Sequence, residues 1–130
     1  MADRIEPRWV RDDVVLAIHD RQLAEHGGPV GVRDAGALDS ALRRPVNQWG
    51  YGTDELCALA AAYAFGIARN HPFVDGNKRT AWMLARQFLR LNGPVLRFTE
   101  REAIGLVQAL AAGDLSEDEL TDWLRAHLAA

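Results

Sequence analysis

The chain has 130 residues, 48% of them hydrophobic and 25% charged, with a formal net charge of −3 and a pI near 5.8. This composition is close to the average of soluble globular proteins, so it excludes disordered, fibrous and low-complexity proteins. The acidic balance gives no electrostatic reason to expect direct nucleic-acid binding. The length predicts a single domain over residues 1–130.

Cysteine use and hydropathy indicate the compartment. Cys57 is the only cysteine, so the chain has no intrachain disulfide framework and no cysteine-rich metal site. No stretch approaches eighteen apolar residues, and residues 1–10 lack the apolar run of a signal peptide. We therefore expect a cytoplasmic protein with no membrane partner.

The first half of the chain predicts two helices and a loop. Apolar residues recur at helical spacing over 12–26, and a Gly-Gly-Pro sequence ends this helix. Asp34 is a suitable cap for a second helix that runs to Arg44. Pro45 is expected to end it, because proline lacks an amide donor and restricts the preceding residue. Residues 46–53 then form a loop or flap.

Two central helices flank one short loop. Asp54 is a suitable cap for the alanine-rich run 55–70, whose larger apolar residues also recur at helical spacing. Pro72 disfavours the helical conformation at His71. A second run over 77–91 is strongly helical and ends at an Asn-Gly-Pro sequence.

The last third of the chain predicts two further helices. After an extended or turn-like segment at 95–98, capping-box sequences stand at 99–102 (Thr-x-x-Glu) and 116–119 (Ser-x-x-Glu). They place helices over about 100–112 and 117–128. The fold class is therefore all-α, a compact bundle of about six helices.

The loop between the central helices carries the candidate chemistry. Lys78 and Arg79 stand in the first turn of a helix, whose amino end already holds unpaired amides and partial positive charge. Two cations there are unfavourable unless an anion binds. Gly76 tolerates unusual backbone angles, as Asn77 does to a lesser degree, so residues 76–78 can form a nest of amides for phosphate oxygens.

Two acid–base groups stand beside this predicted phosphate site. Asp75 is a hard oxygen ligand that can hold Mg²⁺ shared with nucleotide phosphates. His71 is a candidate general base for a substrate hydroxyl, and Phe73 between them is expected to anchor the loop in the core. Taken alone, His71 fits a plain loop residue, residues 75–77 fit an ordinary turn with a helix cap, and residues 78–79 fit a solvated face. Their combination points to phosphate chemistry.

The sequence HPFVDGNKRT at 71–80 resembles the Fic signature, His-x-Phe-x-Asp/Glu-Gly-Asn-Gly-Arg-x-x-Arg, of enzymes that transfer AMP to protein hydroxyls. It departs at Lys78, where those enzymes have a second glycine, and at Trp82, where they have the last arginine. Both departures match the death-on-curing (Doc) branch, whose motif reads His-x-Phe-x-Asp-Ala/Gly-Asn-Lys-Arg-Thr. The similarity extends over most of the chain.

This resemblance implies a Fic/Doc-type bundle and the toxin of a type II toxin–antitoxin system. Such toxins use ATP and Mg²⁺ to phosphorylate a threonine of elongation factor Tu, which stops translation, and a Phd-like antitoxin neutralises them. The roles it implies are catalysis by a set of four residues, metal binding by Asp75, and nucleotide and phosphate binding by a second set. The catalytic residues are His71, Asp75, Lys78 and Arg79, and the phosphate-binding residues are Gly76, Asn77, Lys78 and Arg79.

Several alternatives stay open at this point. Lys78 would fill space above the nest, which favours a reversed nucleotide and phosphoryl transfer, but AMP or other nucleotidyl transfer by the same loop is the alternative. A catalytically silent helical partner or co-regulator is a third reading. The sequence lacks the inhibitory-helix motif of many Fic proteins, so an antitoxin helix bound in a groove is expected instead. Residues 48–52 are a candidate flap for a target peptide or a plain loop.

Overall fold

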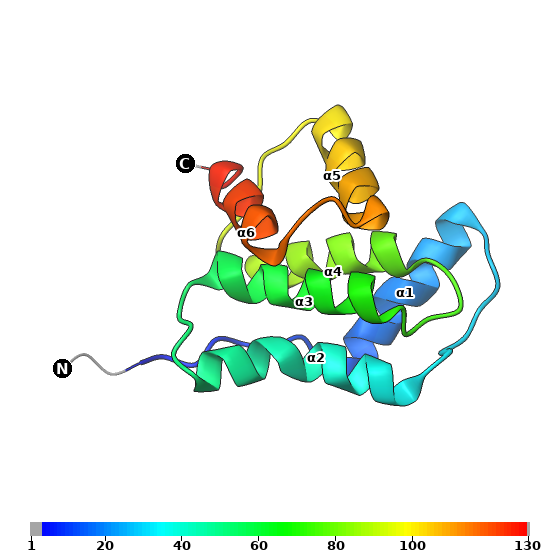
Figure 1. The fold of residues 1–130 in the computed structure, drawn as a ribbon, viewed down its shortest axis with the longest axis horizontal. Helices are drawn as coiled ribbons and strands as arrows, with labels where there is room; N and C mark the ends of the chain where they lie inside the picture. The colour runs from blue at the N-terminus through cyan, green and yellow to red at the C-terminus, as the bar shows by residue number, and fades with distance from the viewer. Residues whose placement is uncertain (1–3, 130) are drawn as a thin grey trace.

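A computed structural model describes residues 4–129 of the chain. Residues 1–3, the start of the segment 1–10 considered above, lie outside the described residues. The described residues form helices without strands, which confirms the all-α class (Figure 1). The helices are α1 (Asp12–His26), α2 (Ala35–Gly50), α3 (Leu56–Asn70), α4 (Asn77–Leu91), α5 (Glu100–Ala112) and α6 (Glu117–Ala126). None of them is long and apolar enough to cross a membrane.

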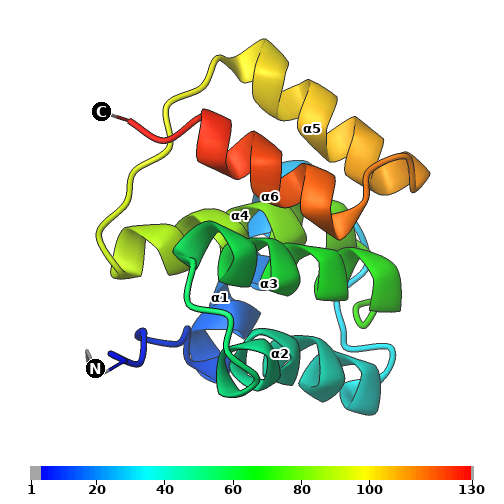
Figure 2. The same cartoon turned by 60° about the vertical axis from the view of Figure 1, so that its left-hand side comes forward.

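Helix α3 is the centre of the bundle. It packs against α2 on one side and against α4 and α6 on the other, as the two views in Figures 1 and 2 show. Its alanine-rich sequence explains this position, because small side chains on every face let several helices approach at once. The residues of α3 from Leu59 to Ala64 are all buried.

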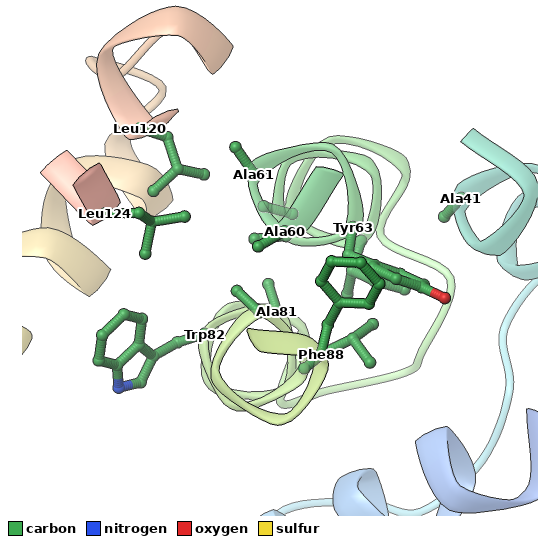
Figure 3. Close-up of a cluster of buried hydrophobic side chains, with 14 of the residues drawn as sticks. Ala41, Ala60, Ala61, Tyr63, Ala81, Trp82, Phe88, Leu120 and Leu124 are labelled. Carbon is green, nitrogen blue, oxygen red and sulfur yellow. The ribbon is translucent and has the colours of Figure 1, made fainter. Parts of the chain in front are cut away.

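Close approach between α2 and α3 requires a glycine. A Cβ atom at Gly66 would lie only 3.2 Å from the Cα and Cβ of Ala41. On the opposite side of α3, Leu120 and Leu124 of α6 reach down toward its alanines, while Tyr63 packs against Phe88 of α4 (Figure 3). The packing of α2, α4 and α6 around α3 therefore fixes the position of both ends of α3.

The predicted end of the second helix at Pro45 is wrong. Helix α2 runs through Pro45 to Gly50, and the proline ring is buried. The lost amide is tolerated because the following turn has tertiary partners: the Gln48 side-chain amide donates to Glu117 of α6 at 2.8 Å, and Trp49 packs against the core. Packing of the second half of α2 therefore outweighs the local cost of the proline.

The same correction applies to the predicted flap. Residues 48–50 belong to α2, and 51–52 form the turn that leads toward α3. This turn lies at the amino end of α3, whereas the loop after α3 lies at its carboxyl end (Figure 1). A target peptide docked on residues 48–52 would be a helix length away from the candidate chemistry, so these residues do not form a flap over it.

The predicted cap at Asp54 is also wrong. The N-cap of α3 is Glu55, which makes no side-chain capping bond. Asp54 instead forms an ion pair with Arg4 at 2.7 Å, and Glu55 pairs with Arg125 of α6 at 2.6 Å. Tertiary ion pairs thus replace the local cap.

The C-terminal helices follow the prediction closely. Both capping boxes are formed, with Thr99 and Ser116 each bonded reciprocally to the glutamate three residues later. Helix α6 ends at Ala126, two residues earlier than expected. The segment before α5 is extended, and Leu96 forms an isolated bridge with Leu128.

Candidate active site

The loop from His71 to Gly76 joins the carboxyl end of α3 to the amino end of α4. His71 is the C-cap of α3 and adopts a left-handed conformation with φ 47°, as no other non-glycine among residues 4–129 does. This conformation costs about 1–2 kcal/mol for a residue with a Cβ. The surroundings hold it in place, because the His71 carbonyl accepts from the Arg33 guanidinium at 2.8 Å. Strain of this kind is typical of functional positions.

The connection between α1 and α2 braces this loop. Val32 forms an antiparallel bridge with Phe73, the amide of Arg33 donates to the Pro72 carbonyl at 2.7 Å, and the amide of Val74 donates to the Gly31 carbonyl at 3.0 Å. Figure 1 shows this connection running beside the α3–α4 loop at the end of the bundle away from both chain ends. The loop is therefore held by one isolated bridge and two backbone hydrogen bonds to the α1–α2 connection.

His19 of α1 packs against the loop and forms a hydrogen bond to it. Its ring stacks on Phe73 with 3.7 Å between centroids, and its Nε2 lies 2.8 Å from the carbonyl oxygen of Asp75. Because that carbonyl can only accept, Nε2 of His19 carries the hydrogen. The prediction that Phe73 anchors the loop is confirmed, since Phe73 is buried. The sequence does not predict the contact of His19 with the loop, because a histidine far away in the sequence gives no pairing signal.

Asn77 also acts within the loop. Its side-chain carbonyl accepts from the Phe73 amide at 2.9 Å, and its side-chain NH₂ donates to the Phe73 carbonyl at 3.0 Å. Gly76 precedes it in the left-handed conformation with φ 76°, as expected for the start of the nest. The buried Asn77 side chain thus closes the loop at the start of α4.

Lys78 and Arg79 are exposed in the first turn of α4, and neither forms an ion pair within residues 4–129. They line a cavity of about 460 Å³ together with His71, Asp75 and Gly76. Two unpaired cations at the positive end of a helix dipole repel one another and the dipole. The structure therefore brings together all the predicted site residues around a cavity suited to an anion.

Asp75 is the candidate metal ligand at this cavity. Its Oδ1 accepts from the Gly76 amide at 2.7 Å, and a Cβ at Gly28 would lie 2.6 Å from its Oδ2. Among the described residues no group of three or more His, Cys, Asp or Glu side chains is placed to hold a metal. One carboxylate at this cavity still fits Mg²⁺, which keeps several waters and binds through one or two carboxylates plus phosphates.

Comparison with known proteins supports the resemblance. A family model described as Fic/DOC family matches residues 9–89. The Toxin Doc of Mycolicibacterium smegmatis is 42% identical over 125 residues, covering 92% of each chain. The Protein kinase doc of Escherichia phage P1 is 34% identical over 119 residues, covering 91% of this chain and 94% of the relative. The chain belongs to the Fic/DOC family.

The two departures from the Fic signature have different surroundings in this Fic/DOC chain. Lys78 is exposed at the active-site cavity. Trp82 (labelled in Figure 3) is buried, and it packs edge-on against Phe98 at 5.2 Å and Trp123 at 5.5 Å between ring centroids. An arginine at position 82 would have to displace this aromatic cluster. The tryptophan therefore serves packing, and of the two departures only Lys78 lines the cavity of the candidate site.

The loop motif does not show which residues outside the loop line the cavity. Helix α5 forms the far wall of the active-site cavity through Val107, Gln108 and Ala111. A larger cavity of about 780 Å³ continues between α1, α4 and α5, and it shares Arg79, Val107 and Gln108 with the first. Arg86 faces this groove, and burial together with the neighbouring Arg90 lowers the pKa of its guanidinium.

Proposed function

We propose that this chain is the toxin of a toxin–antitoxin pair and acts as an ATP- and Mg²⁺-dependent protein kinase. The observation that carries the proposal is the pair of unpaired cations, Lys78 and Arg79, at the amino end of α4 beside His71 and Asp75. A bound polyphosphate would relieve their repulsion. The printed name of the phage P1 relative, Protein kinase doc, supports the same reaction class.

The proposed reaction is transfer of the γ-phosphoryl group of ATP to a threonine hydroxyl. His71 accepts the hydroxyl proton, the oxygen forms a bond to phosphorus, and the bond from phosphorus to the β–γ bridging oxygen breaks, so that ADP leaves. Lys78, Arg79 and the first amides of α4 neutralise the negative charge, which is the main contribution a protein makes to such transfers. Asp75 would hold Mg²⁺, which supplies further charge neutralisation to the phosphates when bound.

Phosphoryl transfer is favoured over AMP transfer by the side chain at position 78. Lys78 lines the active-site cavity, and we infer that a long cation in place of glycine takes up space at the amino end of α4. We infer that the nucleotide then lies with its γ-phosphate, rather than its α-phosphate, next to His71. The burial of Trp82 supports this view, since no arginine is available there for the AMP-transfer arrangement.

We further propose that elongation factor Tu is the target and that the 130 residues act as one cytoplasmic domain. The antitoxin, Phd-like in its mode of binding, would place an amphipathic helix in the groove between α1, α4 and α5. Apolar side chains such as Ile18 and Met83 and the guanidinium groups of Arg86 and Arg90 line this groove, which suits a helix with apolar and acidic faces. Because Arg79 is shared with the active-site cavity, such a helix would compete with the nucleotide.

The test is an intact-mass measurement on purified elongation factor Tu after incubation with the chain, ATP and Mg²⁺. We expect a gain of one phosphoryl group, and no gain with His71→Ala at unchanged melting temperature. A gain of one AMP group would replace phosphoryl transfer with nucleotidyl transfer. No gain, combined with equal toxicity of wild type and His71→Ala in cells, would contradict the enzyme and favour a catalytically silent partner protein.

A further inference from the structure

His71 stands between two cavities that differ in chemistry. One is the active-site cavity with Lys78 and Arg79. The other, which we call the second cavity, has a volume of about 580 Å³ and lies between the carboxyl end of α3 and the connection from α5 to α6. His71 and Ala111 line both. Figure 2 shows the α5–α6 connection passing beside the carboxyl end of α3.

The second cavity is not built for phosphate. Its walls include the apolar side chains Phe65, Leu110 and Leu115, and its charged groups are Arg69 on one side and Asp114 and Glu119 on the other. Two carboxylates against one guanidinium make its surroundings slightly negative, which disfavours a polyphosphate. A volume of this size accommodates several residues of a peptide segment.

The geometry of phosphoryl transfer needs two such entrances. The attacking and leaving oxygens lie roughly in line on opposite faces of the transferred group. With the diphosphate on the side of Lys78 and Arg79, the hydroxyl must come from the other side of the phosphorus while staying within reach of His71. The second cavity is within reach of His71, which forms part of its wall, and neither Lys78 nor Arg79 lines it.

We propose that the second cavity binds the segment of the protein acceptor that carries the reacting hydroxyl, so that donor and acceptor enter from opposite sides of His71. This inference rests on the kinase function proposed above. Its occupant is an exposed loop of the acceptor with an apolar side chain next to the hydroxyl residue. A basic side chain within a few residues pairs with Asp114, which has no ion-pair partner of its own among residues 4–129.

Asp114 offers a clean test because it is exposed, lines only the second cavity and makes no side-chain hydrogen bond among the described residues. Steady-state phosphorylation of elongation factor Tu is measured for wild type, Asp114→Asn and Asp114→Lys, with ATP and the acceptor varied separately. The matched control is Asp118→Lys, the same charge reversal on α6 outside the cavity.

We expect a graded rise in the KM for the acceptor, to about tenfold with Asp114→Lys, while the KM for ATP stays at the wild-type value. Asp118→Lys leaves both constants unchanged. An unchanged acceptor KM in both Asp114 variants overturns the inference. A further variant, Val32→Lys, changes an exposed residue of the α1–α2 connection. A rise in the acceptor KM with Val32→Lys alone also overturns the inference, because it would place the acceptor on the exposed edge of that connection. If wild type transfers nothing to this acceptor, the proposed function fails first and the inference fails with it.

Discussion

The two ends of α3 differ in whether the charged side chains near them form ion pairs. At the amino end, Asp54 pairs with Arg4 and Glu55 with Arg125, so the carboxylates meet guanidinium groups from distant segments. At the carboxyl end, Lys78 and Arg79 share the start of α4 with no carboxylate in ion-pair range among the described residues. One end of the helix is arranged for stability, and the other keeps unfavourable charge that a ligand can neutralise.

Removing a cation at each end gives the largest expected contrast. Lys78→Ala should lower kcat/KM by about 10²–10³, the usual effect of losing one charge-stabilising donor. It should also raise the free energy of unfolding by about 0.3–1 kcal/mol, because it removes a cation from a helix amino end. Arg125→Ala should do the opposite, with a slightly lower melting temperature and wild-type activity. Kinetics and thermal unfolding of both variants check this. A Lys78→Ala protein that loses stability would show that the cation already has a partner within the fold.

Two glycines with similar backbone angles sharpen the contrast. Gly28 has φ 123° and a Cβ there would meet Asp75 Oδ2 at 2.6 Å, whereas Gly52, with φ 112°, has open space around its Cβ position. Gly28→Ala and Gly52→Ala should both lose about 1–2 kcal/mol of stability through backbone strain. Only Gly28→Ala should also lose activity, by about 10- to 100-fold, because it displaces the Asp75 carboxylate. Equal activity in the two variants would contradict a role of the Asp75 carboxylate in the reaction.

His19 is expected to act by positioning the loop. His19→Phe keeps the stacking on Phe73 but loses the hydrogen bond to the Asp75 carbonyl. We expect a loss of about 1 kcal/mol of stability and a roughly tenfold fall in kcat with a smaller change in the KM for ATP. The exposed His26 on the same helix gives the control, since His26→Phe should alter neither constant. A fall in stability with unchanged kcat would show that His19 contributes only to core packing and does not position the loop for catalysis.

The smallest expected effect is a pH dependence of stability far from the loop, where His127 pairs with Glu102 at 2.7 Å. Burial acts to lower the pKa of His127, but its hydrogen bonds to the Trp123 carbonyl and to Glu102 outweigh burial and raise it. The bond from the Thr99 amide, followed by that from His127, lowers the pKa of Glu102.

The signs of these two shifts define a window. A raised histidine pKa stabilises fully below the ordinary value of 6.5, and this stabilisation is lost as the pH rises through the folded-state pKa. A lowered glutamate pKa stabilises above the ordinary value of 4.5 and loses the effect as the pH falls further. The melting temperature should therefore fall between pH 6 and about pH 8 more steeply in wild type than in His127→Gln. Parallel curves would contradict a contribution from this pair.

Local chemistry explains what could be predicted from the sequence. Gly27, the Asn-Gly-Pro sequence after α4 and the two capping boxes each act within one turn of helix, and the bounds they predict agree with the structure. Pro45 and Asp54 misled because distant residues decide there: Glu117 bonds to the turn after Pro45, and Arg4 takes the carboxylate of Asp54. The loop motif gave the site, but its supports came from elsewhere. His19, the α1–α2 connection and the wall of α5 reach it only through the fold.

The central claim is that a nucleotide binds at the carboxyl end of α3 and leaves the amino end untouched. Backbone amide NMR spectra recorded while ATP and Mg²⁺ are added test it most directly. We predict that the largest shift changes fall on Gly76, Asn77, Lys78 and Arg79, that the amides at 54–57 stay unchanged, and that Lys78→Ala weakens the response. Shift changes centred on the amino end of α3, or none at saturating ATP, would contradict the account.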